Sequence, residues 1–171
     1  MIPVIQKILY ATDLSENSAH AFRYAVVLAE DHNAEIVILH VMEGISPASL
    51  NALDIYLSKD KLLKIVETDI EEAVSRIKER LTSFYEREFK REDQALGKDV
   101  SIEVYGGYPA EEILKKADEF GCDVIVMGTH GKGVLSHTFL GSVTEKVLHR
   151  AKIPVFVVPL PKGNTVLTFH D

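Results

Sequence analysis

The chain has 171 residues, of which 46% are hydrophobic and 26% charged, and its formal net charge at pH 7 is −7. We expect residues 1–171 to form one soluble domain with its own core. The negative charge argues against a nucleic acid or an anionic membrane as a partner, and no apolar run approaches the roughly 20 residues of a membrane span. Cys122 is the single cysteine, which excludes an internal disulfide and favours the reducing cytoplasm.

Strands and helices are predicted to alternate along the chain. Lys7 interrupts the apolar start and no small-residue cleavage site follows, so a first strand is expected there and not a signal peptide. In chain order the expected elements are strand Ile5–Tyr10, a helix at about 15–31, strand Glu35–Val41, a long charged helix at about 59–92, strand Val100–Tyr105, a helix at 110–120 stopped by Gly121, strand Asp123–Met127, helix Val143–Arg150 and strand Val155–Val158. Such alternation predicts an α/β fold, namely an open, Rossmann-like parallel sheet of five strands with helices on both faces.

Two segments exceed this minimal pattern. Residues 44–58 form a loop insertion of mixed composition after the second strand. Residues 160–171 form a C-terminal tail that contains a short strand-like run.

A glycine-rich segment joins the fourth strand to the last helix. It runs from Gly128 through Gly131 to Gly141 and Ser142. Glycines between a strand and a helix let backbone N–H groups approach a phosphate, and the helix N-terminus adds a partial positive charge. The same glycines are also compatible with a tight connection and nothing more.

In an open parallel sheet, ligands bind beyond the carboxyl ends of the strands, where the strand order reverses. The first strand ends at Ala11, Thr12 and Asp13, and the second ends at Val41. If the first and fourth strands are neighbours, these ends converge with Gly128. We therefore expect Asp13 and Val41 to line the same pocket as Gly128.

Several of these residues have structural alternatives. Ser142 and Glu145 have the spacing of a capping box, so Ser142 is expected to cap the last helix and also to touch a ligand. Asp13 is either a ribose or metal ligand or the N-cap of the first helix. Lys132 is either a phosphate ligand or an exposed loop lysine, and His130 has a loop-packing role more readily than a catalytic one.

Several segments of the sequence resemble those of a known protein family. Tyr108-Pro-Ala-Glu-Glu-Ile-Leu114, Cys122-Asp-Val-Ile-Val-Met-Gly-Thr-His-Gly131, Leu140-Gly-Ser-Val-Thr-Glu-Lys-Val-Leu148 and Ile153-Pro-Val-Phe-Val-Val158 are similar to segments of universal stress proteins. The stretch Ile8–Glu16 resembles the first strand and turn of that family, although Ala11 stands where many members have proline. The intact Gly-x2-Gly-x9-Gly-Ser signature is that of the ATP-binding members.

This resemblance implies a sheet order of 3-2-1-4-5 and a bound ATP. It implies that the glycine signature with Val143 and Thr144 surrounds the phosphates, that Asp13 lies at the ribose, and that Val41 and Met127 flank the adenine. The residues expected at the nucleotide are therefore Ala11, Thr12, Asp13, Val41, Met127, Gly128, Gly131, Lys132, Gly141, Ser142, Val143 and Thr144. Mg²⁺ or Mn²⁺ is expected beside the polyphosphate, with Asp13 as its ligand through water.

The family also implies a homodimer that forms through the last strand, with Val155, Phe156, Val157 and Val158. Two functions are consistent with these features. The first is a cytoplasmic ATP-binding regulator of the stress response. The alternative is a slow, metal-dependent ATP hydrolase or phosphotransferase, for which Asp13 and His130 are the available helpers.

Overall fold

The computed structural model describes residues 2–43, 59–89, 100–130 and 140–159, with side chains described for 70–87 of the second range. The predicted loop 44–58, the tail 160–171, Gly131 and Lys132 lie outside these residues. The elements are β1 (Lys7–Thr12), α1 (Glu16–His32), β2 (Glu35–Met42), α3 (Lys59–Phe89), β3 (Val100–Gly106), α4 (Pro109–Glu119), β4 (Val124–Gly128), α5 (Ser142–Arg150) and β5 (Val155–Val158).

The five strands form one parallel sheet in the order β3-β2-β1-β4-β5. This confirms the fold class and the strand order predicted from the sequence. The strand β3 lies at one edge of the sheet, and β5 lies at the other. The order reverses between β1 and β4, whose carboxyl ends therefore lie side by side.

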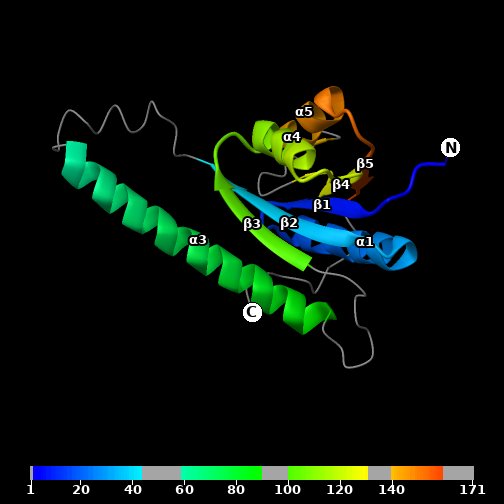
Figure 1. Cartoon of the computed structure of the whole chain (residues 1–171), viewed down its shortest axis with the longest axis horizontal. Coiled ribbons are helices and arrows are strands. Elements are labelled where there is room, and N and C mark those ends of the chain that lie inside the picture. The colour runs from blue at the N-terminus through cyan, green and yellow to red at the C-terminus, as the bar shows by residue number, and fades with distance from the viewer. Residues whose placement is uncertain (1, 44–58, 90–99, 131–139, 160–171) are drawn as a thin grey trace.

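Helices cover both faces of the sheet (Figure 1). α1 and α3 pack on one face, where Phe22 of α1 contacts Tyr10 and Phe84 in a continuous aromatic cluster. α4 and α5 pack on the other face against apolar side chains that alternate with those of the first core. This alternation divides the side chains of each strand between two cores, one on each face of the sheet.

The first strand begins two residues later than predicted, at Lys7 and not at Ile5. The carboxylate of Asp123 fixes this start, because its Oδ2 accepts from the backbone N–H groups of Gln6 and Lys7 at 2.8 and 2.9 Å. α4 ends at Glu119, and Gly121 follows its C-cap as expected, with a φ of +64° that favours glycine. The N–H groups of Gly121 and Cys122 bond the carbonyls of Asp118 and Ala117, which completes the C-terminal cap.

Candidate functional site

The turn between β1 and α1 is built around a residue in the left-handed region. Leu14 has φ of +64° and is 5% exposed, and its N–H donates to Thr12 Oγ1 at 3.0 Å. This turn moves the start of the helix beyond Asp13. Ser15, and not Asp13, is the N-cap of α1, with its Oγ accepting from the N–H of Ser18 at 3.2 Å.

Asp13 is thereby released from capping and is held by Ser15. Its Oδ1 accepts from the N–H of Ser15 at 3.1 Å and from the Ser15 hydroxyl at 2.6 Å. The capping alternative for Asp13 is therefore wrong. The carboxylate lies in a fixed place at the carboxyl end of β1.

α5 begins differently from α1. Its N-cap is Gly141, with φ of −70° and no side-chain capping bond. The predicted capping role of Ser142 is wrong, because Ser142 is already the first residue of the helix. The helix begins one residue earlier than the capping-box pattern suggested, and in the described part of the chain its N-cap residue makes no side-chain hydrogen bond to the first turn.

The end of β4 is bonded to the start of α5 and to the end of β5. The Gly128 carbonyl accepts from Thr144 Oγ1 at 2.9 Å, and the Thr129 carbonyl accepts from the N–H of Gly141 at 2.7 Å. The N–H of Thr129 donates to the carbonyl of Val158 at 2.9 Å, which joins this turn to the end of β5. The Thr144 hydroxyl donates its hydrogen bond to the Gly128 carbonyl. Within the predicted phosphate site it therefore fixes the backbone and does not donate to a ligand.

Asn17 reaches the same turn from the first turn of α1. Its Nδ2 donates to the His130 carbonyl at 2.5 Å, and the side chain lies directly over Gly128. A Cβ at position 128 would lie 2.6 Å from Asn17 Nδ2. The glycine at 128 is thus required by packing inside the protein, whatever its role toward a ligand.

These strand ends and helix starts enclose a cleft of about 560 Å³ at the carboxyl edge of the sheet. Every predicted site residue that the structure describes lines it: Ala11, Thr12, Asp13, Val41, Met127, Gly128, Gly141, Ser142, Val143 and Thr144. As the topology predicts, Asp13, Val41 and Gly128 share one pocket.

The cleft also contains residues that the sequence reasoning did not single out: Ser18, Leu39, His40, Met42, Glu43, Pro109 and Ile113. Pro109 and Ile113 belong to the start of α4, which follows β3 at the same edge of the sheet. The topology that brings the ends of β1, β2 and β4 to the cleft therefore brings the start of α4 there as well.

His40 joins the ends of the two central strands. Its side chain is 7% exposed, and its Nδ1 lies 2.8 Å from the carbonyl oxygen of Thr12. Because a carbonyl only accepts, Nδ1 carries a proton. This bond holds the chain just before Asp13 against β2.

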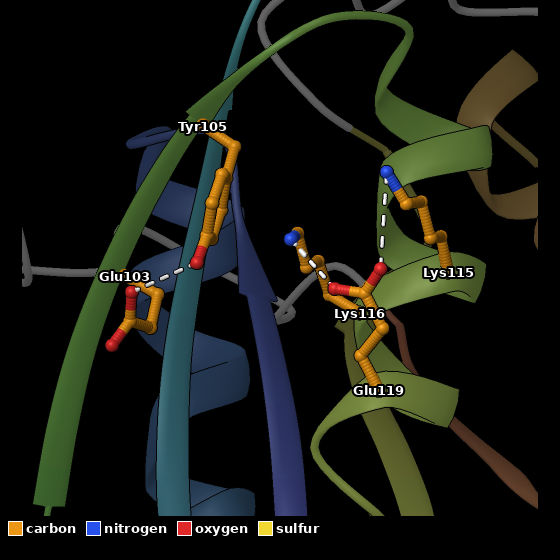
Figure 2. Close-up of polar contacts among 5 residues, drawn as sticks. All are labelled: Glu103, Tyr105, Lys115, Lys116 and Glu119. Atoms are coloured by element: carbon orange, nitrogen blue, oxygen red, sulfur yellow. Dashed lines mark hydrogen bonds and ion pairs between the residues drawn. The ribbon is translucent and has the colours of Figure 1, made fainter.

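Two reactive side chains near α4, those of Lys116 and Cys122, take part in packing away from the cleft. Figure 2 shows Lys116 between Tyr105 and Glu119, with its Nζ 2.7 Å from Glu119 Oε2 and 3.8 Å from the centroid of the Tyr105 ring. The hydrogen bond to Glu119 raises the pKa of Lys116 and lowers the pKa of Glu119. Burial raises the pKa of the Cys122 thiol to about 11, as expected of a core cysteine.

No helix in the described part of the chain is long and apolar enough to cross a membrane. Among the same residues, no three side chains of His, Cys, Asp or Glu come together as a metal site.

Comparison with known proteins identifies the family. The model of the universal stress protein family matches residues 5–159. The chain belongs to this family. Universal stress protein MJ0577 of Methanocaldococcus jannaschii is 34% identical over 158 residues, which cover 92% of this chain and 97% of that protein. Universal stress protein YxiE of Bacillus subtilis is also 34% identical over 158 residues, covering 91% of this chain and 99% of the relative.

Solved structures agree with the family. The structure of MJ0577 superposes with a TM-score of 0.70 at 28% identity and covers 94% of this chain and 100% of its own. A universal stress protein solved in complex with cAMP has a TM-score of 0.56 at 21% identity, covering 93% of this chain and 100% of its own. At that identity the second likeness concerns the fold.

Proposed function

We propose that this universal stress protein is an ATP-binding regulator of the stress response, homodimeric and cytoplasmic, that holds ATP in the cleft at the carboxyl edge of the sheet. The observation that carries this proposal is the uncapped N-terminus of α5 at Gly141. The first N–H groups of a helix need acceptors, and Gly141, as the N-cap residue, has no side chain to supply one. An anion beside Gly141 and Ser142 satisfies them and interacts favourably with the helix dipole.

The opposite part of the cleft suits an adenosine. Leu39, Val41, Met127 and Ile113 supply apolar surface for a base, and the carboxylate of Asp13 is an acceptor for ribose hydroxyls. The volume of about 560 Å³ lies within the range of roughly 300–1,000 Å³ that is usual for small-molecule sites. With a net charge of −7, the attraction for a polyphosphate has to come from local dipoles of this kind.

The lining of the cleft also fits a divalent cation bound together with the nucleotide. Mg²⁺ is commonly held by one or two carboxylates, several waters and the phosphates of its ligand. Asp13 and Glu43 are the carboxylates that line the cleft in the described part of the chain. Asp13 would hold the ion, directly or through water, and the ion would neutralise charge on the phosphates.

Storage of ATP is favoured over its rapid cleavage. Hydrolysis requires a group that orients water and a cation that neutralises the developing charge. Among the described residues that line the cleft there is no lysine or arginine. Asp13 and His130 remain the groups available for the slow hydrolysis that forms the alternative.

The dimer is proposed to form through β5. This strand lies at the edge of the sheet, and Phe156 on it is 41% exposed. The Phe156 ring lies 6.1 Å from that of Tyr24 on α1, and Val27 of the same helix is 52% exposed. Pairing with a second β5 would satisfy the free strand edge and cover this apolar surface.

Nucleotide binding is tested by denaturing the purified protein and identifying what it releases, followed by titration with ATP and Mg²⁺. We expect ATP in amounts close to one per chain, or saturable binding of added ATP that exceeds the affinity for adenosine. cAMP is the appropriate competitor because a protein of this fold was solved with it. Absence of any nucleotide, together with no binding of ATP, adenosine or cAMP, would refute the proposal.

The dimer is tested by sedimentation velocity. Phe156→Asp is expected to convert a dimer into a monomer, since the charge would be buried at the pairing edge. Val4→Asp is the control, because Val4 is 68% exposed and lies before β1. A monomeric wild type, or a Phe156→Asp dimer as stable as the control, would contradict the assignment.

A further inference from the structure

Three consecutive carbonyls at the start of the glycine-rich segment are each bonded to a different partner. The Gly128 carbonyl is bonded by the hydroxyl of Thr144, the Thr129 carbonyl by the N–H of Gly141, and the His130 carbonyl by Nδ2 of Asn17. A carbonyl oxygen carries partial negative charge and repels an anion. Bonds that hold all three oxygens on protein donors keep them out of the path of a phosphate.

Two of these donors, Thr144 and Gly141, belong to the start of α5. The third, Asn17, lies on α1, which packs on the opposite face of the sheet. It is 5% exposed, and its Nδ2 donates to the His130 carbonyl at 2.5 Å. It reaches this carbonyl by passing over Gly128, where a Cβ would approach Nδ2 to 2.6 Å. The contact therefore needs both the amide at 17 and the missing side chain at 128.

The other half of the Asn17 amide is unsatisfied. In the part of the chain that the structure describes, its Oδ1 is buried and has no hydrogen-bond partner. A buried acceptor without a donor destabilises the fold, so an apolar residue of similar size would serve stability better. The presence of asparagine is explained if the N–H donor to His130 is what the protein requires.

We propose that Asn17 is a positioning residue for the phosphate end of the cleft. By holding the His130 carbonyl, it turns this oxygen away from a bound anion. This inference rests on the proposed binding of a nucleotide and adds a determinant of its phosphate affinity.

The test compares ATP with adenosine in the full-length protein. Asn17→Ala removes the donor, and Asn17→Asp keeps the size but places a carboxylate against the His130 carbonyl. We expect Asn17→Ala to weaken ATP binding at least tenfold and Asn17→Asp to weaken it further, while adenosine binds within about twofold of wild type. Loss of a purely structural contact would change both ligands together, so the ratio of the two affinities is the informative quantity.

Asp123→Ala is the matched control for lost stability. It removes the acceptor of two backbone hydrogen bonds at the start of β1, at the opposite edge of the sheet from the cleft. We expect a lower Tm with an unchanged ratio of ATP to adenosine affinity. A control that shifts this ratio as much as Asn17→Ala does would overturn the positioning role.

A second measurement tests the contact itself and needs no ligand. Gly128→Ala should lower Tm by roughly 3 °C or more in the wild type, because the new Cβ meets Asn17. In the Asn17→Ala background the same change should lower Tm much less, since the obstructing amide is gone. Equal losses in both backgrounds would overturn the contact on which the proposal depends.

The outcomes separate this inference from the proposed function. If the wild type binds neither ATP nor adenosine, the proposed function fails and the inference falls with it. If the wild type binds ATP and Asn17→Ala binds it equally well, the proposed function stands and the inference alone is wrong.

Discussion

α1 and α5 both begin at the carboxyl edge of the sheet, after the neighbouring strands β1 and β4, yet their first turns are built in opposite ways. α1 is closed by the Ser15 hydroxyl, which accepts from the N–H of Ser18. The N-cap of α5 is Gly141, which makes no side-chain capping bond. Among the described residues, one helix start is thus capped by a side chain and the other is not.

The two helix starts use their polar groups differently. Around α1, polar side chains are used to build structure, because Ser15 holds Asp13 and Asn17 holds the His130 carbonyl. At α5 the N-cap residue has no side chain, and the hydroxyl of the buried Thr144 in the first turn donates to the Gly128 carbonyl. An anion site of this design depends on donors in the backbone, and on side chains that remove the competing acceptors.

The largest effect on stability and binding is expected from a substitution at Gly128, where Asn17 of α1 packs against the end of β4. Gly128→Val places a branched side chain at a point where even a Cβ would lie 2.6 Å from Asn17 Nδ2. We expect a loss of about 3 kcal/mol in the free energy of unfolding, as is typical of overpacked buried sites, together with loss of ATP binding. Urea denaturation measures the first effect and titration the second.

This result would show that Gly128 is needed for packing as well as for binding a ligand. A valine at a glycine that serves only a ligand would abolish binding and spare the fold. If Gly128→Val is as stable as wild type, the packing of Asn17 over Gly128 is wrong. Gly106→Val is a useful control, because a Cβ at Gly106 would meet no atom within 4 Å.

A second substitution, Gly141→Asp, gives α5 a side-chain N-cap, as α1 has. Gly141→Asp supplies a good N-cap, which should leave stability unchanged or raise it by a few tenths of a kcal/mol. The carboxylate would occupy the N–H groups proposed for the phosphates and repel them. We expect ATP affinity to fall at least tenfold, equivalent to about 1.4 kcal/mol, with a smaller effect on adenosine.

Gly141→Asn separates the cap from the charge in this experiment. Asparagine caps a helix about as well as aspartate but is neutral. It should weaken ATP binding less than Gly141→Asp does. Unchanged ATP affinity in both variants would remove the N-terminus of α5 from the phosphate site.

The sequence predicted the sheet and the cleft better than the details of the turns. Buried parallel strands appear as runs of β-branched residues such as Glu35–Met42, and strand order with topology then brings Asp13 and Val41 to Gly128. The left-handed conformation of Leu14 is not visible in a leucine, and it moves the cap of α1 from Asp13 to Ser15. A pattern of local spacing cannot include such a turn.

Asn17 was missed for a related reason. Its partner His130 is 113 positions away in the chain, and no local pattern connects them. Ser142 and Glu145 have the spacing of a capping box, but the helix begins one residue earlier because the N–H of Gly141 is bonded to Thr129. In both cases a tertiary contact decides how a polar side chain is used.

Ser15→Ala is expected to have a moderate effect. It removes the side-chain cap of α1 and one of the two hydrogen bonds that Ser15 gives to Asp13. Loss of a serine N-cap costs about 1 kcal/mol, which urea denaturation can measure. Ser15→Asp should restore the cap but not the hydroxyl bond to Asp13, so recovery of stability without recovery of nucleotide affinity would separate the two roles. No loss of stability in Ser15→Ala would contradict the assigned cap.

Ser142→Ala gives the smallest effect and the sharpest contrast with Ser15→Ala. If Ser142 were the cap of α5, the same serine-to-alanine change would again cost about 1 kcal/mol. Because Ser142 is the first helical residue and Gly141 is the cap, alanine should change the free energy of unfolding by no more than about 0.5 kcal/mol. The two variants measured side by side in urea therefore test whether one helix start is closed by a side chain and the other is open. Equal losses at both serines would contradict that difference, since they would place a side-chain cap at each helix.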